Sequence, residues 1–409
     1  MRIVYRSASA VLFVAATMAW PTAVSALTDL VLNVDCASGS RIGQALNRPT
    51  LFDRRLVVVV SGTCTENVTI ERDDVVLRAG SSGGGITSAD STKPVILVNG
   101  ARRVALEGLV VTGGRDGIRI ASGGTAEIRG GAVRNSSFTG VLAISGASAT
   151  VDGTVVEGHG QYGVGANGAT VTVLRSNLRS NNFSGAVAAS GGALTLGQID
   201  DAGNVCCGNT IEGNRLDGVT VARAASARLF DNTIRGNGVA TGRWGLLVVE
   251  ESMAWLEGGN VLSGNGMPGQ VQPANGGGAF VRASTLRAGA GDQPVVPSSN
   301  EISGNTFGIV TNTANLELRG GLRITGNTFN GINVDQGTRL RTDGSSITAN
   351  GSSGIQASQA SGVVFLGTAN NVSGNGQFGL ICFDVGSHFA GSTSGVTGNV
   401  MGQVNCTPF

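Results

Sequence analysis

Charged side chains are scarce in this sequence. Only 13% of the residues are Asp, Glu, Lys or Arg, the formal net charge is +1, and Lys93 is the only lysine. A protein that binds nucleic acid or an anionic membrane needs a much stronger positive field, so both partner classes are excluded. A disordered chain would be rich in charge and poor in apolar residues, whereas 41% of these residues are hydrophobic. The chain is therefore expected to be ordered.

Clusters of cysteine and histidine are also lacking. The sequence has six Cys and two His, without a Cys-x-x-Cys motif or a nearby His pair, which excludes the usual zinc-site spacings. Cysteines in this number fit an oxidising compartment. We expect one disulfide near each end of the chain: Cys36–Cys64 and Cys382–Cys406. The adjacent Cys206 and Cys207 could form a vicinal disulfide or remain two thiols.

A stretch long enough to span a membrane is absent as well. Two arginines precede one short apolar run at residues 8–20, and a small-x-small site ends at Ala26. This order is typical of a secretory signal peptide, and the run is too short to cross a bilayer. Residues 1–26 are therefore predicted to be a signal peptide. The mature protein, residues 27–409, would be secreted to the periplasm or the exterior and would have no transmembrane segment.

The most informative feature that is present is a repeat. An apolar residue, any residue, Gly and Asn return as "IEGN" from Ile211, "IRGN" from Ile234, "ISGN" from Ile302 and "ITGN" from Ile324. The basic step is about 23 residues, and each unit holds three short alternating stretches between Gly, Asn and Ser turns. This suits one turn of a solenoid, whereas a propeller blade needs about 40 residues and four strands. We expect a single all-β domain of roughly 12 or 13 turns with parallel strands.

The asparagines of these motifs share one expected role. At one corner of each turn, an Asn side chain can hydrogen-bond the backbone and the Asn of the next turn, at ~1 kcal/mol per bond. The predicted ladder contains Asn181, Asn214, Asn237, Asn265, Asn305, Asn327, Asn350, Asn375 and Asn399. His159, in the variant "VEGH", falls in the same column, where an imidazole can replace the amide. The Gly before each alternating apolar pair, as in "GINV" from Gly331, is expected to give the corner a positive φ.

Strands with this "GNxxxGIxV" spacing and an asparagine ladder resemble the right-handed parallel β-helix of the pectate-lyase-like superfamily. The segment "GTCTENVTIERDDVVLRAG", residues 62–80, also resembles the first turns of such proteins. The resemblance covers nearly the whole mature chain. It implies a three-strand solenoid and a theme of acidic polysaccharide, and it matches no specific enzyme family.

The catalytic residues of that superfamily do not appear in register. Polygalacturonases place carboxylates on successive turns just before the Gly-Ile strand. In that column of this chain, Asp116 and Asp217 are four turns apart, or ~19 Å. The two carboxyls of a glycosidase lie within about 5–10 Å of each other. This pair is therefore excluded as acid and base, and no other catalytic set is identified.

Loop insertions supply the candidate binding residues. The longer steps of the repeat fall at about 197–210, 238–243, 266–277 and 288–299, and loops from neighbouring turns can wall a groove. Four residues in this belt are candidates for contact with a polysaccharide: Trp244, Glu250, Glu251 and Trp255. Aromatic residues also recur beside the marker Gly, among them Tyr162, Phe183, Phe307 and Phe329, where a structural stack is favoured over sugar binding.

Acidic residues near the first insertion are the candidates for a metal site. Asp200, Asp201 and Glu212 flank the segment "NVCCGN", and carboxylates are the ligands that calcium prefers. Adjacent acids in a polar loop are more often simply solvated. The sequence thus requires no cofactor, and calcium is the one ion that it could hold.

Outward-facing positions after the marker Gly form an apolar stripe that includes Leu142, Val187, Leu247, Phe280 and Val310. An exposed stripe of this length would indicate a contact surface for oligomers, unless the register is wrong locally or a loop covers it. Three hypotheses follow. The first is an exported protein that binds polysaccharide or has a structural role at the cell surface. The alternatives are a polysaccharide lyase or glycoside hydrolase of unfamiliar type and an oligomeric scaffold.

Overall fold

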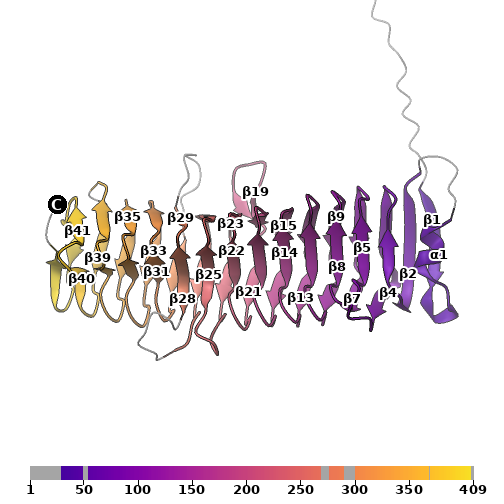
Figure 1. Cartoon of the computed structure of the whole chain (residues 1–409), viewed down its shortest axis with the longest axis horizontal. Helices are drawn as coiled ribbons and strands as arrows, with labels where there is room; N and C mark the ends of the chain where they lie inside the picture. The colour runs from indigo at the N-terminus through magenta and orange to yellow at the C-terminus, as the bar shows by residue number, and fades with distance from the viewer. Residues whose placement is uncertain (1–28, 49–53, 269–275, 290–299, 368, 407–409) are drawn as a thin grey trace, which may run out of the picture.

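The structure is a computed structural model that describes residues 29–48, 54–268, 276–289, 300–367 and 369–406. Its strands follow one another along a single axis, from the N-terminal helix to the last turn (Figure 1). They form a sheet of 27 strands, here sheet 1, and a sheet of 14 strands, here sheet 2. Neighbouring turns pair in parallel in both sheets. The fold is thus a parallel β-helix. The predicted signal peptide lies outside the described residues.

Each turn contributes one strand to sheet 2 and two strands to sheet 1. The strands of sheet 2 are β3 (Val68–Ile70), β5 (Ile96–Asn99), β8 (Ile118–Ala121), β11 (Val141–Ile144), β14 (Val164–Asn167), β17 (Ala186–Ala189), β22 (Val219–Ala222), β25 (Trp244–Val249), β28 (Gly277–Arg282), β31 (Ile309–Asn312), β34 (Ile332–Asp335), β37 (Ile355–Ala357), β40 (Phe378–Cys382) and β43 (Gly402–Asn405).

Sheet 1 begins with three strands, β1 (Leu30–Asp35), β2 (Leu56–Thr65) and β4 (Val75–Ser88), of which the longer two span both of its columns. The first column continues with β6 (Val104–Glu107), β9 (Thr125–Arg129), β12 (Ser148–Asp152), β15 (Thr170–Leu174), β18 (Ala193–Leu196), β23 (Ser226–Phe230), β26 (Met253–Gly258), β29 (Thr285–Ala288), β32 (Asn315–Leu318), β35 (Arg339–Thr342), β38 (Gly362–Phe365) and β41 (His388–Ala390). The second column holds β7 (Val110–Gly113), β10 (Ala132–Arg134), β13 (Val155–Glu157), β16 (Asn177–Arg179), β21 (Thr210–Glu212), β24 (Thr233–Arg235), β27 (Val261–Ser263), β30 (Glu301–Ser303), β33 (Arg323–Thr325), β36 (Ser346–Thr348), β39 (Asn371–Ser373) and β42 (Val396–Thr397).

Three short strands per turn are what the repeat predicts. The 14 strands of sheet 2 correspond to slightly more turns than the 12 or 13 expected from the sequence. The difference arises at the N-terminal end, where the first turns lack the Gly-Asn corner on which the sequence count depends. Their long strands also obscure the step of the repeat.

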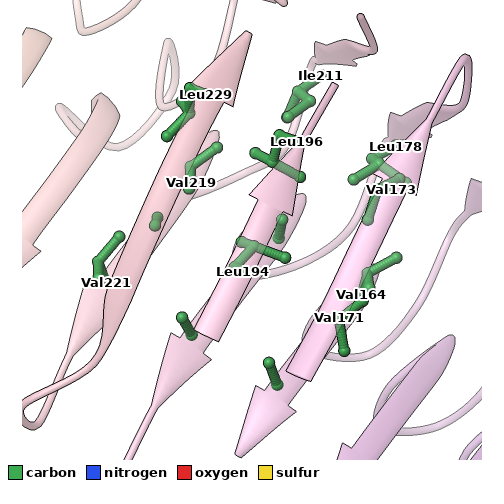
Figure 2. Packing of buried hydrophobic residues seen from close by; sticks show 14 of the residues in the cluster. Val164, Val171, Val173, Leu178, Leu194, Leu196, Ile211, Val219, Val221 and Leu229 are labelled. Carbon is green, nitrogen blue, oxygen red and sulfur yellow. The ribbon is translucent and has the colours of Figure 1, made fainter. Parts of the chain in front are cut away.

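The core consists of like residues stacked from turn to turn. Val171 and Leu194 occupy paired positions on β15 and β18, and Val173 and Leu196 do so two residues later. Figure 2 shows these side chains pointing into the interior beside those from sheet 2, such as Val219. All five residues are at most 1% exposed. Period-2 alternation places every second side chain inside, which is why a chain with few aromatic residues can fill this narrow core.

A short helix covers the N-terminal end of the described solenoid (Figure 1). At the N-terminal end, the short helix α1 (Ile42–Leu46) buries Ile42, Ala45 and Leu46. The Glu66 carboxylate accepts hydrogen bonds from the backbone N–H groups of Ile42 (2.7 Å) and Gly43 (3.1 Å), which caps the helix.

A disulfide lies near each end, in the pairing expected from the sequence. The bridges are Cys36–Cys64, beside the 3-10 turn η1 (Cys36–Ser38), and Cys382–Cys406, which joins the ends of β40 and β43. Each ties one turn to the next, and all four cysteines pack with the hydrophobic core.

The asparagine ladder is present as expected. In each step, the Asn side-chain oxygen accepts from the backbone N–H and the amide N–H of the preceding Asn, as Asn350 does from Asn327 at 3.2 and 2.9 Å. The amide of Asn327 also donates to the Ile302 carbonyl (3.2 Å). His159 occupies the column as predicted, because its backbone N–H donates to Asn181 Oδ1 (3.2 Å).

A second ladder runs along the corner between the two columns of sheet 1. Its members are Asn209, Asn232, Asn260 and Asn300. Asn209 donates to Asn232 Oδ1 through both its backbone N–H (3.0 Å) and its amide (2.9 Å). The sequence carries a signal for it, since each of these residues stands two positions before a buried Ile or Leu.

The marker glycines have a different role from the one expected. Gly218 is not among the residues with positive φ, whereas Gly213 and Gly236, which precede the ladder asparagines, have φ of 60° and 61°. A Cβ on Gly218 would lie 2.5 Å from Ile234 Cγ2 and 2.6 Å from the Gly245 carbonyl oxygen. The expectation of a positive φ was therefore wrong. The marker position needs Gly because the next turn leaves no space for a side chain.

Two of the four predicted insertions are described in full. Residues 197–210 contain a hairpin of β19 (Gln198–Ile199) and β20 (Val205–Cys206), which is antiparallel. Residues 238–243 form a compact turn in which Gly242 N–H donates to the Gly238 carbonyl (2.8 Å). The insertions at 266–277 and 288–299 lie largely outside the described residues. Within the described part of the chain, no helix is long and apolar enough to cross a membrane.

Candidate functional site

In the strands of sheet 2, outward side chains alternate with buried ones. In β8, Ile118 and Ile120 are buried, whereas Arg119 between them is partly exposed. The strand register places the equivalent residues of successive turns in one line, as the sequence predicts. This line contains Arg119, Leu142, Gly165, Val187, Thr220, Leu247, Phe280, Val310, Asn333, Gln356 and Ile381.

The apolar part of this line is partly covered by aromatic side chains. Trp244 stacks on Phe280 with ring centroids 5.2 Å apart, and Phe307 contacts Phe329 at 5.1 Å. These rings pack with Val310, which is only 3% exposed. The stripe is therefore not the continuous exposed surface that the oligomeric-scaffold hypothesis needs, because residues from the preceding corner fold over it.

Asp217 anchors the centre of this face. Its carboxylate accepts hydrogen bonds from the Trp244 backbone N–H (2.9 Å) and from Arg243 Nη2 (2.9 Å), with Thr220 Oγ1 at 3.5 Å. Asp217 is 2% exposed. Burial raises the pKa of Asp217, and the guanidinium of Arg243 acts in the opposite direction. The carboxylate thus fixes the return of the 238–243 insertion and the position of Trp244.

The Arg243 side chain keeps hydrogen-bonding capacity beyond this ion pair. It is 39% exposed, and among the described residues its buried Nε has no hydrogen-bond partner. A guanidinium has five N–H donors, so Arg243 can hold Asp217 and still offer donors to a ligand or to water.

Asp116 occupies the same column four turns earlier and makes similar contacts. It accepts from the Thr139 backbone N–H (3.3 Å) and from Arg119 Nε (2.8 Å), and it is fully buried. Burial raises the pKa of Asp116, while Arg119 lowers it. Four strand spacings separate Asp116 from Asp217, or ~19 Å. Both carboxylates are committed to local structure, and the pair is too far apart for glycoside hydrolysis.

A further aromatic pair lies on the two turns before Asp217. Tyr162 and Phe183 meet edge to face with centroids 5.7 Å apart, and Phe183 is 39% exposed. Burial raises the pKa of the Tyr162 hydroxyl. We call the surface formed by these groups the aromatic face. Its residues are Tyr162, Phe183, Asp217, Arg243, Trp244, Phe280, Phe307 and Phe329.

The four binding residues predicted from the sequence do not converge. Trp244 belongs to the aromatic face on sheet 2. Glu250 and Glu251 are exposed at the corner between β25 and β26, with φ of 58° and 60°. Trp255 lies on β26, in the first column of sheet 1, where its neighbours on the adjacent strands are two arginines. One corner of the solenoid thus separates the two tryptophans.

The predicted metal ligands belong to different local structures. Asp200 accepts from the Asn204 backbone N–H (2.8 Å) and caps the hairpin tip, beside the exposed Asp201. Glu212 lies on β21 and pairs with Arg235 (2.8 Å). No group of three or more His, Cys, Asp or Glu side chains that could hold a metal ion occurs among the residues that the structure describes. Asp200 and Glu212 are thus engaged in local contacts.

One charged surface was not anticipated from the sequence. The outward residues of the second column of sheet 1 alternate in charge over five turns: Arg134, Glu157, Arg179, Glu212 and Arg235. The last four of these residues border a shallow cavity of ≈ 790 Å³. Arg179 donates to Glu157 (2.7 Å) and lowers its pKa. The signal in the sequence was the residue before each corner Asn, Gly or Ser, whose charge alternates from turn to turn. This alternation indicates cross-strand ion pairs that stabilise the sheet.

Comparison with known proteins addresses the fold. A family model described as a right-handed β-helix region matches residues 94–267. The chain is a right-handed parallel β-helix. No curated protein sequence matches it.

Several solved β-helices are similar to it in structure at low sequence identity. A pectate lyase is 15% identical, with 71% of this chain and 77% of that chain covered and a TM-score of 0.38. The A-module of a mannuronan C-5 epimerase from Azotobacter vinelandii is 12% identical, with coverages of 86% and 87% and a TM-score of 0.38. A family 28 exopolygalacturonase from Yersinia enterocolitica is 12% identical, with coverages of 93% and 79% and a TM-score of 0.30. At these values no activity is carried over to this β-helix.

Proposed function

We propose that this β-helix is an exported polysaccharide-binding protein that holds a glycan along the aromatic face without cleaving it. The observation that supports this function is the combination, on one side of sheet 2, of the partly exposed rings of Tyr162, Phe183 and Phe280 with the Asp217–Arg243 pair. Export is supported by the signal-peptide pattern of residues 1–26 and by the three disulfides, which persist in oxidising compartments.

The chemistry of the aromatic face suits a sugar chain. Pyranose rings present apolar C–H faces, which pack on aromatic rings such as Phe183 and Phe280, and hydroxyl groups, which need donors and acceptors. Arg243 pairs with Asp217, which lies on the turn between those of Phe183 and Trp244, and still offers donors. From the turn of Tyr162 to the turn of Phe280 there are four strand spacings, or ~19 Å, which is long enough for several sugar units.

The ionisable groups of this region favour binding over turnover. The Asp217 carboxylate is tied to Trp244 and Arg243, and the raised pKa of Tyr162 keeps its hydroxyl protonated at neutral pH, so that little phenolate is present to act as a base. His159 is buried, and both its ring nitrogens lie within hydrogen-bonding distance of backbone groups. Each of these groups is held by local structure rather than poised to transfer a proton.

The test is retention on a panel of immobilised neutral and acidic polysaccharides, combined with detection of new reducing ends and unsaturated uronates. We expect retention of at least one polysaccharide and no product. Phe183→Ala should weaken retention about tenfold, because an aromatic contact is worth ~1 kcal/mol or slightly more. Trp255→Ala is the matched control on the other sheet and should bind normally. Product formation would establish the lyase or hydrolase alternative, and failure to retain any polysaccharide, or loss only in Trp255→Ala, would refute this proposal.

A further inference from the structure

Cys206 and Cys207 form a disulfide between adjacent residues. They lie at the end of the β19–β20 hairpin, which is the one antiparallel strand pair in the described part of the chain. In Figure 1 this hairpin projects from the row of parallel strands. Both cysteines are partly exposed, so a solute of small size can reach the bridge.

This bridge differs from the two end disulfides in what it can stabilise. Cys36–Cys64 and Cys382–Cys406 close loops with separations of 28 and 24 residues and pack with the core. The separation between Cys206 and Cys207 is 1 residue. A disulfide stabilises mainly by restricting the unfolded chain, and the effect grows with the loop it closes. The adjacent pair closes almost no loop, so stabilisation of the fold does not explain it.

The two sulfur atoms have different surroundings. Arg175 Nη1 lies 3.5 Å from Cys207 Sγ, and Gln198 Nε2 lies 3.7 Å from the same atom. Among the described residues, no side chain donates a hydrogen bond to Cys206 Sγ. A guanidinium beside sulfur stabilises the thiolate relative to the thiol, so Cys207 is the better leaving group of the pair.

Arg175 is held in this position from two sides. Its Nε donates to Asp152 Oδ1 (2.9 Å), which orients the guanidinium toward the hairpin. Its backbone N–H donates to the Cys207 carbonyl oxygen (2.9 Å). The second bond fixes the Cys207 backbone to the solenoid, so the sulfur of Cys207 stays near the cation when the bridge is opened.

We propose that Cys206–Cys207 is a thiol–disulfide exchange site that reacts with low-molecular-weight thiols. A thiolate attacks Cys206 Sγ and forms a mixed disulfide, while the Cys206–Cys207 bond breaks and its electron pair remains on Cys207 as a thiolate beside Arg175. A second thiolate then attacks the sulfur of the bound small molecule. It releases the Cys206 thiolate and forms the small-molecule disulfide. The protein gains two electrons, and two small thiols are oxidised to one disulfide.

The reaction is tested on the folded, oxidised protein with reduced glutathione as the probe. After short exposure, free thiols are trapped with N-ethylmaleimide and the peptides are mapped by mass spectrometry. We expect glutathione on Cys206, maleimide on Cys207 and intact end disulfides. Arg175→Gln should slow formation of the adduct several-fold, whereas Arg179→Gln, an exposed arginine bonded to Glu157 rather than to sulfur, should not.

A second measurement separates the electrostatic role of Arg175 from a structural one. In Cys206→Ser, the alkylation rate of Cys207 as a function of pH reports its thiol pKa. We expect a value below the ordinary ~8.5 of a free cysteine, and a rise toward that value when Arg175→Gln is added. The proposal is overturned if the end disulfides react as fast as this pair, if glutathione is found on Cys207, or if Arg175→Gln leaves both the rate and the thiol pKa unchanged. None of these outcomes depends on polysaccharide binding.

Discussion

His159 provides the most quantitative test of how the ladder works. It is fully buried in a column made mostly of asparagines. Its Nδ1 accepts from the Ser136 backbone N–H (3.1 Å), and its Nε2 lies 3.1 Å from the Val133 carbonyl oxygen. These partners require a neutral ring with the proton on Nε2, because a proton on Nδ1 would face another N–H. Burial accordingly lowers the pKa of His159 to about 4.

The linkage between protonation and folding gives the size of the effect. The unfolded chain takes up a proton near pH 6.5, whereas the folded chain does so only near pH 4. The neutral ring therefore contributes fully above about pH 6.5, and stability is lost as the pH falls from about 6.5 toward 4. A difference of roughly 2.5 pKa units corresponds to about 3 kcal/mol over this window.

His159→Asn should abolish this acid sensitivity, because an amide fits the ladder and does not titrate. The assay is urea unfolding followed by circular dichroism at about pH 7.5, 6 and 4.5. These pH values run from above the pKa of His159 in the unfolded chain toward its pKa in the folded chain. The gap in unfolding free energy between the variant and the wild type should widen as the pH is lowered. His388→Asn, which removes the other histidine, is the control and should retain the acid-sensitive loss. Parallel loss of stability in His159→Asn and the wild type would refute the assignment of a buried, neutral imidazole to the ladder.

Three further predictions concern stability. Asn327→Ala should lower the unfolding free energy by about 1–3 kcal/mol, measured from urea midpoints, because it leaves ladder groups unpaired at a buried corner; an unchanged midpoint would mean that the ladder bonds add nothing. Asp335→Asn should stabilise the protein at pH 7 but not below about pH 4. Burial raises the pKa of Asp335, so the folded protein disfavours the ionised carboxylate, which forms only above the pKa of the unfolded chain. A difference in unfolding free energy between variant and wild type that is absent at pH 7, or that grows in acid, would contradict this. Replacing Cys382 and Cys406 by Ser should remove about 3 kcal/mol in the chain-entropy model and speed hydrogen exchange in β43, and unchanged exchange there would show that the bridge does not restrain the last turn.

The fold could be predicted because the sequence contains a regular repeat. Each ladder Asn, such as Asn327, stands three positions after a buried Ile, Leu or Val of its own turn, and the basic step to the Asn of the next turn is lengthened only where a loop is inserted. The same regularity correctly placed His159 in the column, whereas the two end disulfides were expected from the positions of their cysteines near the ends of the chain. The second ladder, from Asn209 to Asn300, obeys an equally simple rule and could have been found by reading the residue two positions before each buried apolar residue.

The candidate site could be predicted only in part, because it depends on residues outside the repeat. Arg243 is the last residue of an insertion. Its pairing with Asp217 on the previous turn therefore depends on the path of that loop and not on the period of the repeat. Trp244 and Trp255 are close in sequence, yet a corner places them on different sheets. The sequence pattern gives the alternation of each strand but not which outward face carries the candidate site.

The most direct test of the central claim is to find where a bound glycan touches the molecule. Side-chain footprinting by carbene labelling and mass spectrometry would be carried out with and without the polysaccharide that the panel retains most strongly. Binding along the aromatic face predicts protection of Tyr162, Phe183 and Phe280, with unchanged labelling of Trp255 on the other sheet. Protection centred on Trp255, or no change at the aromatic face under conditions of full retention, would contradict the account.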